Sequence, residues 1–395
     1  MVEAETPTML DIDFAAHNRE AAEVWEAYYA GHPIRVPVFL GINVRYWLLS
    51  PWLNPRKITF QEYFEDADLM LETQLEFLSY VFHNLLQDAP LGVPEAGWQF
   101  LKVDLQNCYD AGWFGCPVRH YDGQVPDTEP ILHDDNKGML FDRGIPDPLR
   151  GGLMEKNLRF YERMLERSRT ITFQGAPVTL VWPAGLNTDG VFTAAANLRG
   201  ATELCVDVCE DPDYVKELLA FVTEALIVRV KAWRELAGEP LKPEVGGFAD
   251  DCAQLLSVDA YREFVLPCHK RLFSELAGKG PHCMHMCGDA SHLLKTMRDE
   301  LNVKSFDTGY PIDFGQLRGE LGPDVEIKGG PSVQFLMQAA PDQVREECRR
   351  VLDSGVMEGG RFVLREGNNM APGTPEENIS AMYYAAKEFG GYASR

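Results

Sequence analysis

The stretch "HCMHMCGDASHLLKTMRDELNVKSFDTG", residues 282–309, decides the fold. The segments "HCMHMCG" and "VKSFDTG" predict two strands, and "DASHLLKTMRDEL" between them predicts a helix. Two strands separated by one helix of this length are typical of a βαβ unit, in which the strands lie parallel in one sheet. The same order of elements should therefore extend to both sides of this stretch.

The C-terminal part of the chain, about 220 residues, continues this alternation. Strand-like runs alternate with helical segments, and both kinds are found at regular intervals. The strands are expected in 178–183, 243–250, 325–330 and 359–367, and the helices in 211–238, 257–278, 313–322, 340–355 and 374–391. This order predicts a parallel sheet covered by helices.

Helix start and stop signals support these boundaries. Asp211 is a predicted N-cap with Pro212 at the first helical position, and Gly238 predicts the end of that helix. Pro267 should kink the helix that Ser257 caps. Further signals are Pro341 at the start of its helix and a capping box formed by Thr374 and Glu377.

Polar residues follow the predicted strands at their carboxyl ends. They are Asp250–Asp251, His285–Cys287, Asp307, Gly329–Gly330 and Glu366–Asn369. A (β/α)₈ (TIM) barrel gathers such strand ends at one face, where its active site lies. We therefore predict an α/β fold of this type, with a doubly wound open sheet as the alternative. The first strand is not followed by G-x-G-x-x-G, which argues against a dinucleotide-binding fold.

The N-terminal half is less regular. A helix is expected in 13–32, within an N-terminal helical extension over 1–35, and "RVPVFLGINV" (35–44) predicts a strand buried on both faces. Apolar spacing predicts another helix over 66–86. Residues 87–152, rich in Gly, Pro and Asp, predict an irregular insertion or cap on a single barrel domain that comprises 1–395.

Composition excludes several classes of protein. A net charge of −23 argues against binding to nucleic acid or to anionic membranes; it favours solubility or, alternatively, an acidic face for a basic partner. The start "MVEAETPTMLDIDF" has no signal-peptide h-region, and the most apolar stretch is too short to span a bilayer. We expect a cytoplasmic protein whose nine cysteines are reduced thiols or metal ligands.

Side chains alternate along a strand, so Cys283, His285 and Cys287 share one face and Met284 lies on the other. Met suits packing against helices, which leaves His285 and Cys287 pointing into the barrel. An imidazole and a thiolate at such positions can converge on one Zn²⁺. The alternative is that both residues simply pack, since cysteine is often buried.

Several motifs, in this order, resemble the uroporphyrinogen decarboxylase superfamily. They are "CVDVCEDPDYVKELLAFVTEAL", "ADDCAQLLSVDAYREFVLPCHKRL", "HMCGD", "FDTGYPIDFGQLRGELGPDVEIKGG" and "REGNNMAPGTPEENISAM". The resemblance implies a (β/α)₈ barrel and two alternative chemistries. The decarboxylases use no cofactor, and their motif "RQAGRY" is here "GINVRY", which keeps only Arg45 and Tyr46. Their "GHG" is "GNN", with Asn368 in place of the histidine.

The other branch, the corrinoid-dependent zinc methyltransferases, is closer in motif. Its H-x-C zinc pair matches His285 and Cys287, but its later cysteine corresponds to Asn368. The resemblance implies zinc, with Asp307 as a candidate third ligand and Glu366 or Cys252 as alternatives.

The remaining candidate site residues are assigned in the same way. Asp250 or Asp251 supplies a proton or orients a ligand, or else caps the helix at Ser257, and Glu366 and Asn368 are further catalytic candidates. The residues expected to line the substrate pocket are Arg45, Tyr46, Trp182, Asn187 and Tyr310.

Three functions remain open. The first is zinc-dependent transfer of a methyl group between a small methylated substrate or thiol and a corrinoid carried by a separate protein, because the chain has no D-x-H-x-x-G cobalamin motif. The second is a metal-free, decarboxylase-like lyase with Arg45 as the anchor for an anionic substrate. The third is a relative that only binds a corrinoid or tetrapyrrole, with Asn368 marking lost catalysis. A homodimer is compatible with all three.

Overall fold

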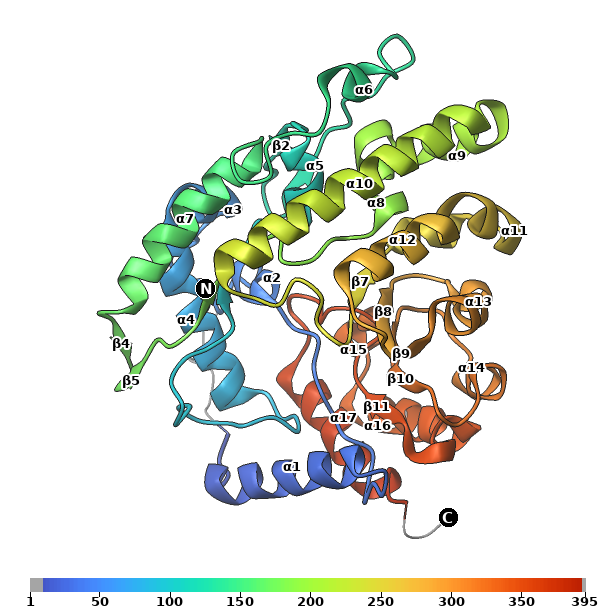
Figure 1. The fold of residues 1–395 in the computed structure, drawn as a ribbon. Coiled ribbons are helices and arrows are strands. Elements are labelled where there is room, and N and C mark those ends of the chain that lie inside the picture. The colour runs from blue at the N-terminus through green and yellow to red at the C-terminus, as the bar shows by residue number, and fades with distance from the viewer. Residues whose placement is uncertain (1–9, 393–395) are drawn as a thin grey trace.

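The computed structural model describes residues 10–392 (Figure 1). Its largest sheet has five strands in the order β11-β10-β9-β8-β7, and every neighbouring pair is parallel. These strands are β7 (Gly247–Ala249), β8 (His282–Met286), β9 (Val303–Thr308), β10 (Glu326–Gly329) and β11 (Phe362–Leu364). The expected strands at 243–250, 282–288, 303–309, 325–330 and 359–367 are thus confirmed, although each is shorter than predicted.

Further parallel segments, including a separate two-stranded sheet, contribute to the wall of a (β/α)₈ barrel. β1 (Leu101–Lys102) pairs with β6 (Val181–Trp182), and Trp98 bridges to Val178 in the same direction. At the other edge, Val38 bridges to Leu364 of β11. The predicted fold class is therefore confirmed.

Two expectations for the N-terminal half need correction. β1 belongs to the barrel wall, so residues 87–152 are not an insertion throughout. The segment 35–44 makes only isolated bridges, and its faces differ, because Val38 is fully buried whereas Phe39 is 47% exposed. The rest of 87–152 contains only short elements: η1 (Gln106–Cys108), α5 (Tyr109–Trp113), β2 (Val118–Arg119), β3 (Asp127–Thr128) and α6 (Met139–Arg143). Further along the chain, β4 (Thr172–Phe173) and β5 (Ala176–Pro177) form an antiparallel hairpin.

Helices cover the outside of the strands (Figure 1). The N-terminal half contributes α1 (Phe14–Tyr29), α2 (Val44–Leu48), α3 (Phe60–Glu65), α4 (Ala67–Asn84), α7 (Leu153–Ser168), α8 (Val191–Arg199) and α9 (Ala201–Glu210). The C-terminal half contributes α10 (Pro212–Ala237), η2 (Asp251–Leu255), α11 (Val258–Ala260), η3 (Tyr261–Val265), α12 (Leu266–Leu276), α13 (Ser291–Leu301), α14 (Phe314–Leu321), α15 (Val333–Gln338), α16 (Pro341–Val351), η4 (Leu352–Val356), η5 (Glu358–Gly360) and α17 (Glu376–Phe389).

Most of the predicted helix signals are confirmed. α10 begins at Pro212 and ends at Gly238, whose φ of 73° is a left-handed conformation that glycine adopts without strain. The helix that starts after Ser257 is interrupted by a π-helical turn, Tyr261–Val265, just before Pro267, so regular α-helical hydrogen bonding is broken where the kink is predicted. The capping box at Thr374 is wrong: Pro375 holds the N-cap position, and the Thr374 hydroxyl donates to the Ala371 carbonyl instead.

α10 also fixes the loop that follows β6. Arg229 and Asp110 form an ion pair in which neither side chain has any exposed surface. Arg229 donates to the carbonyl oxygens of Gly185 and Asn187, and Asp110 accepts hydrogen bonds from Thr188. These bonds satisfy buried polar groups that would otherwise destabilise the fold, so they hold the loop against α10.

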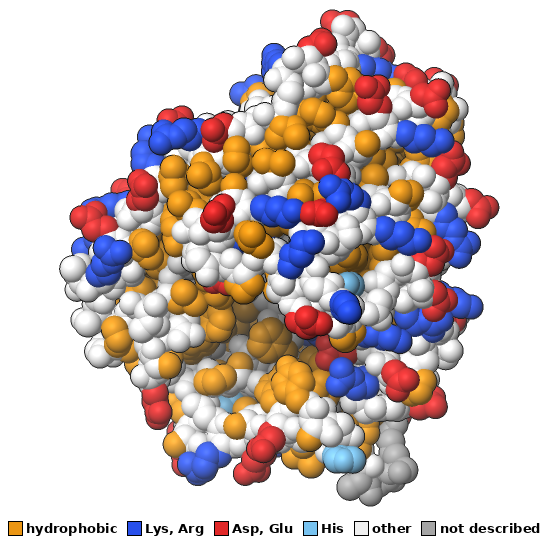
Figure 2. Space-filling view, viewed as in Figure 1, with side chains coloured by type: hydrophobic (Ala, Val, Ile, Leu, Met, Phe, Trp, Pro, Cys, Tyr) orange, Lys and Arg blue, Asp and Glu red, His pale blue; other side chains and the backbone are white. Residues whose placement is uncertain are grey.

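The two faces of the strands differ in burial. Residues that point outward, such as Met284 and Phe306, are 2% and 0% exposed and pack against the helices. Residues that point into the barrel, such as Cys283, His285 and Asp307, are only half-buried. The hydrophobic core thus lies mainly between the strands and the helices, as predicted for Met284, and the lumen is left partly open. Figure 2 shows a hollow on the face viewed, with hydrophobic side chains exposed in it.

The hydrophobic side chains of the core form one connected cluster that runs from Val36 to Ala386. That supports the prediction of one domain over the described residues. Within the same residues, none of the helices combines the length and hydropathy that crossing a membrane would need.

Candidate metal centre

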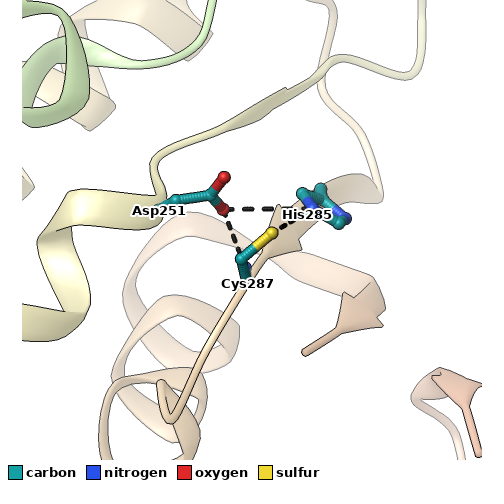
Figure 3. Close-up of side chains that lie close together, drawn as sticks. All are labelled: Asp251, His285 and Cys287. Atoms are coloured by element: carbon teal, nitrogen blue, oxygen red, sulfur yellow. Dashed lines mark hydrogen bonds and ion pairs between the residues drawn. The ribbon is translucent and has the colours of Figure 1, made fainter. Parts of the chain in front are cut away.

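Three side chains meet above the carboxyl end of β8 (Figure 3). Asp251, His285 and Cys287 each offer one ligand atom, and these atoms lie within 4.8 Å of one another. The Nε2 atom of His285 is 3.0 Å from the Cys287 sulfur and 3.9 Å from Oδ1 of Asp251. The backbone N–H of Cys287 donates to the same Asp251 oxygen at 2.7 Å.

The pairing of β7 and β8 explains why these residues meet. Ala249 lies beside His285 in the parallel register. Two residues further along each strand come Asp251 and Cys287, which therefore lie side by side, one level nearer to the barrel mouth. The prediction that His285 and Cys287 share the inward face is confirmed.

Asp307 contacts the other side of the imidazole. Its Oδ2 atom is 2.7 Å from Nδ1 of His285 and accepts a hydrogen bond from Arg365 at 2.8 Å. The expected third ligand is therefore to be revised: the structure groups Asp251, not Asp307, with His285 and Cys287. Asp307 instead occupies the place of a carboxylate that fixes the orientation and tautomer of a ligating histidine.

The electrostatics of the cluster follow from these contacts. Burial acts to lower the pKa of His285, but the hydrogen bonds with Asp307 and Cys287 outweigh it and raise that pKa to about 10. Burial raises the pKa of the Cys287 thiol, and the bond with His285 offsets only part of that rise. A half-buried imidazole and thiol held this close suit a bound cation, because a metal ion takes the place of the protons on the ligand atoms.

The donor set fits Zn²⁺. Imidazole nitrogen, thiolate sulfur and carboxylate oxygen are the three zinc ligand types in proteins. In a tetrahedral site with bonds of about 2.0–2.3 Å, neighbouring ligand atoms are about 3.5 Å apart. The separations of 3.0 and 3.9 Å lie on either side of this value. Three protein ligands leave a fourth position for a substrate atom.

Asn368 also reaches the cluster. Its Oδ1 atom lies 3.2 Å from the Cys287 sulfur. The side chain therefore contacts the thiol in the place where the resemblance implies a cysteine.

The two alternative third ligands lie elsewhere. Glu366 is fully buried and accepts hydrogen bonds from Arg365 and from the backbone N–H of Gly41. Its burial raises its pKa to about 7. Cys252 contacts Thr193 through its backbone N–H. Neither residue belongs to the group formed by Asp251, His285 and Cys287.

Asp250 faces away from this group. Its carboxylate, which is fully buried, accepts hydrogen bonds from Thr193 and from the N–H of Phe192, at the start of α8. It also lies 2.7 Å from Nε2 of His269. The predicted cap by Ser257 is confirmed, because its side chain accepts a hydrogen bond from the N–H of Ala260. The alternative role of Asp250 as a cap for that helix is therefore wrong, since Asp250 caps the start of α8 instead. The arrangement suits a residue that holds α8 against β7.

The candidate substrate-binding residues are scattered. Arg45 donates to Gln106 and Asn107 at the edge of the barrel mouth. Tyr46 is 3% exposed, and its hydroxyl donates to the Thr374 carbonyl, so its ring lies in the core. Trp182 is half-buried, with an indole N–H that has no partner among the described residues.

The last two candidates lie nearer to the surface. Asn187 is exposed and donates to the Gly247 carbonyl, which joins the loop after β6 to β7. Tyr310 is 46% exposed.

Arg365 was not singled out from the sequence. It bridges Asp307 and Glu366 and donates to the backbone oxygen of Asn368, so it links the last strand to the cluster. Its position, two residues after Val363 on the inward face of β11, is the signal that would have indicated this role.

Residues 114–389 match the uroporphyrinogen decarboxylase (URO-D) family. The chain belongs to this family. Its relatives carry two kinds of name, decarboxylase and methyltransferase. The methylated-thiol–coenzyme M methyltransferase of Methanosarcina mazei is 29% identical over 201 residues, which cover 50% of this chain and 51% of that protein.

Two other relatives are similar at lower identity. The uroporphyrinogen decarboxylase of Nostoc punctiforme is 24% identical over 56% of this chain and 59% of its own length. The methylcobamide:CoM methyltransferase MtaA of Methanosarcina barkeri is 27% identical over 51% of this chain and 57% of its own length. The chain thus spans about half the length of the curated relatives that it matches.

A solved structure supports the fold over nearly the whole chain. The structure of a methyltransferase from Methanosarcina mazei has a TM-score of 0.64 and 20% identity, and the match covers 93% of this chain and 98% of that one. At this identity the likeness concerns the fold alone.

Proposed function

We propose that this protein is a methyltransferase that moves a methyl group between a small methylated substrate or thiol and a corrinoid carried by another protein. The observation that carries the proposal is the convergence of Asp251, His285 and Cys287 within 4.8 Å. Two relatives with methyltransferase names support it, one of them named for a methylcobamide.

Each residue of the site has a separate task in this proposal. His285, Cys287 and Asp251 would hold zinc, which when bound lowers the pKa of a substrate thiol or polarises a leaving oxygen or nitrogen. Asp307 accepts the Nδ1–H hydrogen of His285, so that the Nε2 lone pair points toward the other two ligands. Arg365 holds Asp307 in place.

The lyase alternative finds less support in the site. A pocket for a substrate with several carboxylates needs cations that face it unpaired. Arg365 is engaged by Asp307 and Glu366, and Arg45 is engaged by Gln106 and Asn107. The Arg365 charge is neutralised by the two carboxylates, and Arg45, whose printed partners are neutral amides, offers one cation where a substrate with several carboxylates needs several.

The test is metal content together with methyl transfer, on protein purified without a His-tag. We expect about one zinc per chain in the wild type and a loss of zinc in His285→Ala, Cys287→Ala and Asp251→Ala. The matched control is Cys283→Ala, which removes a thiol from the same strand face but one level deeper. Equal zinc in wild type and His285→Ala would overturn the metal site.

The reaction itself is followed by the absorbance change when cob(I)alamin becomes methylcobalamin. Wild-type protein with a panel of O-, N- and S-methyl donors should produce this change, and the three ligand variants should not. Zinc-loaded protein that produces no change with any donor class, but releases CO₂ from a carboxylated substrate, would favour the lyase.

A further inference from the structure

Two cysteines outside the candidate metal centre line a cavity at the surface of the protein. Cys205 and Cys209 lie four residues apart on α9, so their side chains project from the same side of the helix. The cavity, of about 510 Å³, is formed by two adjacent rows of α9 side chains and by Leu255 of η2. The rows are Ala201, Cys205 and Cys209, and Thr202, Val206 and Glu210.

The two cysteines face away from the packed side of α9. The helix packs against α8 and α10, and its buried residues are Leu204 and Asp207. Cys205 is half-buried and Cys209 is exposed, and Val206 beside them is 47% exposed. A ligand that enters the cavity from the solvent can therefore reach both cysteine side chains.

The charges around the two thiols favour a cation. Burial raises the pKa of Cys205, and the Cys209 thiolate adds to that rise, so the two sulfur atoms influence each other. Two neighbouring thiolates repel each other, and a cation between them removes the repulsion. Cys209 also lies in the last turn of α9, where the helix dipole and the Glu210 carboxylate favour positive charge.

Helix geometry limits what these thiols can do. Side chains four residues apart in an α-helix have Cβ atoms about 5–6 Å apart, whereas a disulfide needs about 3.5–4.5 Å. Cys205 and Cys209 therefore cannot form a disulfide while α9 stays helical. An ion placed between the sulfur atoms spans the longer distance and leaves the helix unchanged.

The number of ligands indicates the kind of ion. Zinc in a structural site takes four protein ligands. Within residues 10–392, the only group of three metal-ligand atoms within 4.8 Å of one another is that of Asp251, His285 and Cys287. Cys205 and Cys209 instead offer a pair of soft sulfur ligands, and such ligands select Cu(I), which is stable with only two of them.

We propose that Cys205 and Cys209 bind a soft monovalent cation of the class of Cu(I) at the surface of α9. On binding, each thiol loses its proton to the solvent, both sulfur atoms coordinate the ion, and the ion keeps its oxidation state. The site is separate from the candidate metal centre, and the inference does not rest on methyl transfer.

The test is anaerobic titration of the full chain with Cu(I), in competition with a chromophoric Cu(I) chelator. The background variant is Cys287→Ser, in which the candidate metal centre supplies no thiolate. We expect this variant to bind about one Cu(I) per chain tightly. Adding Cys205→Ser or Cys209→Ser should lower the affinity by about 10²- to 10⁴-fold, because the second sulfur no longer acts at a high effective concentration.

The matched control adds Cys268→Ser to the same background. It removes a half-buried thiol of α12 that donates to the Phe264 carbonyl, and Cu(I) binding should be unchanged. Circular dichroism checks that each variant is folded. The X-ray absorption spectrum of the bound Cu(I) should show coordination by a pair of sulfur atoms, which adventitious binding would not give.

Two results overturn the proposal: no tight Cu(I) binding by Cys287→Ser, or equal binding with and without Cys205→Ser. The helix geometry is tested separately by treating the folded, metal-free protein with oxidised glutathione. We expect Cys205 and Cys209 to stay unlinked to each other. A disulfide between them at unchanged helix content would refute the geometric argument. Neither experiment measures methyl transfer, so both are independent of the proposed function.

Discussion

The hydrogen bond between Asp307 and His285 offers a sharp test of how the cluster is built. Asp307→Asn keeps the shape of the side chain and an acceptor oxygen, but removes its charge. A hydrogen bond to a charged group contributes about 1.5–3 kcal/mol and a neutral one about 0.5–1.5 kcal/mol. The 2.7 Å contact should therefore weaken by about 1.4 kcal/mol, which corresponds to about tenfold in zinc affinity. This lies at the lower end of the effects known for residues that support metal ligands.

The assay is competition for zinc with a chromophoric chelator at constant pH. Asp251→Asn, which alters one of the converging ligands, should lose more affinity than Asp307→Asn. The control Asp324→Asn changes an exposed carboxylate in the turn before β10 and should match the wild type. Wild-type affinity in Asp307→Asn would refute an orienting role, and a greater loss there than in Asp251→Asn would restore Asp307 as the ligand.

Three further outcomes are expected. Arg229→Met leaves Asp110 charged and buried, so urea unfolding should show a loss of about 3–5 kcal/mol, which an added Asp110→Leu should largely restore. Asp250→Ala removes the bonds to α8 and His269 and should lower the midpoint of thermal unfolding, while metal analysis shows zinc at the wild-type level. Burial acts to raise the pKa of Glu326, but the charge of Lys328 and the bonds it accepts hold that pKa below 4.5. Its ionised form therefore stabilises the fold above about pH 4.5 and is lost on acidification, so the stability of the wild type should fall more steeply between about pH 5 and 3 than that of Glu326→Gln.

The sequence allowed much of the C-terminal half to be predicted because the signals there are local. A period of two residues placed Cys283, His285 and Cys287 on one face, and Asp211, Pro212 and Gly238 framed a helix. The identity of the third converging residue could not be predicted in this way. It depends on the register between β7 and β8, which puts Asp251 beside Cys287 and is set by contacts far apart in the chain.

The errors in the N-terminal half have a similar cause. β1 is only two residues long, and its pairing with the distant β6 is what defines it as a strand. The sequence around it is rich in Gly, Pro and Asp, which by itself indicates a loop. The spacing of Thr374 and Glu377 fits a capping box, but Pro375 takes the N-cap position, and the threonine then satisfies Ala371. Competition between neighbouring local bonds decides such cases.

The unequal burial of the two strand faces has a consequence for how this protein can change over evolutionary time. Substitutions at outward positions such as Phe306 disturb tightly packed contacts and so threaten folding itself. Lumen positions such as Lys328 and Ser305 contribute little of that packing, so mutation can alter which compounds are accepted at a small cost in foldability. One scaffold of this kind can give rise to enzymes with different substrates, and directed evolution aimed at a new substrate should begin with libraries at the lumen-facing sites.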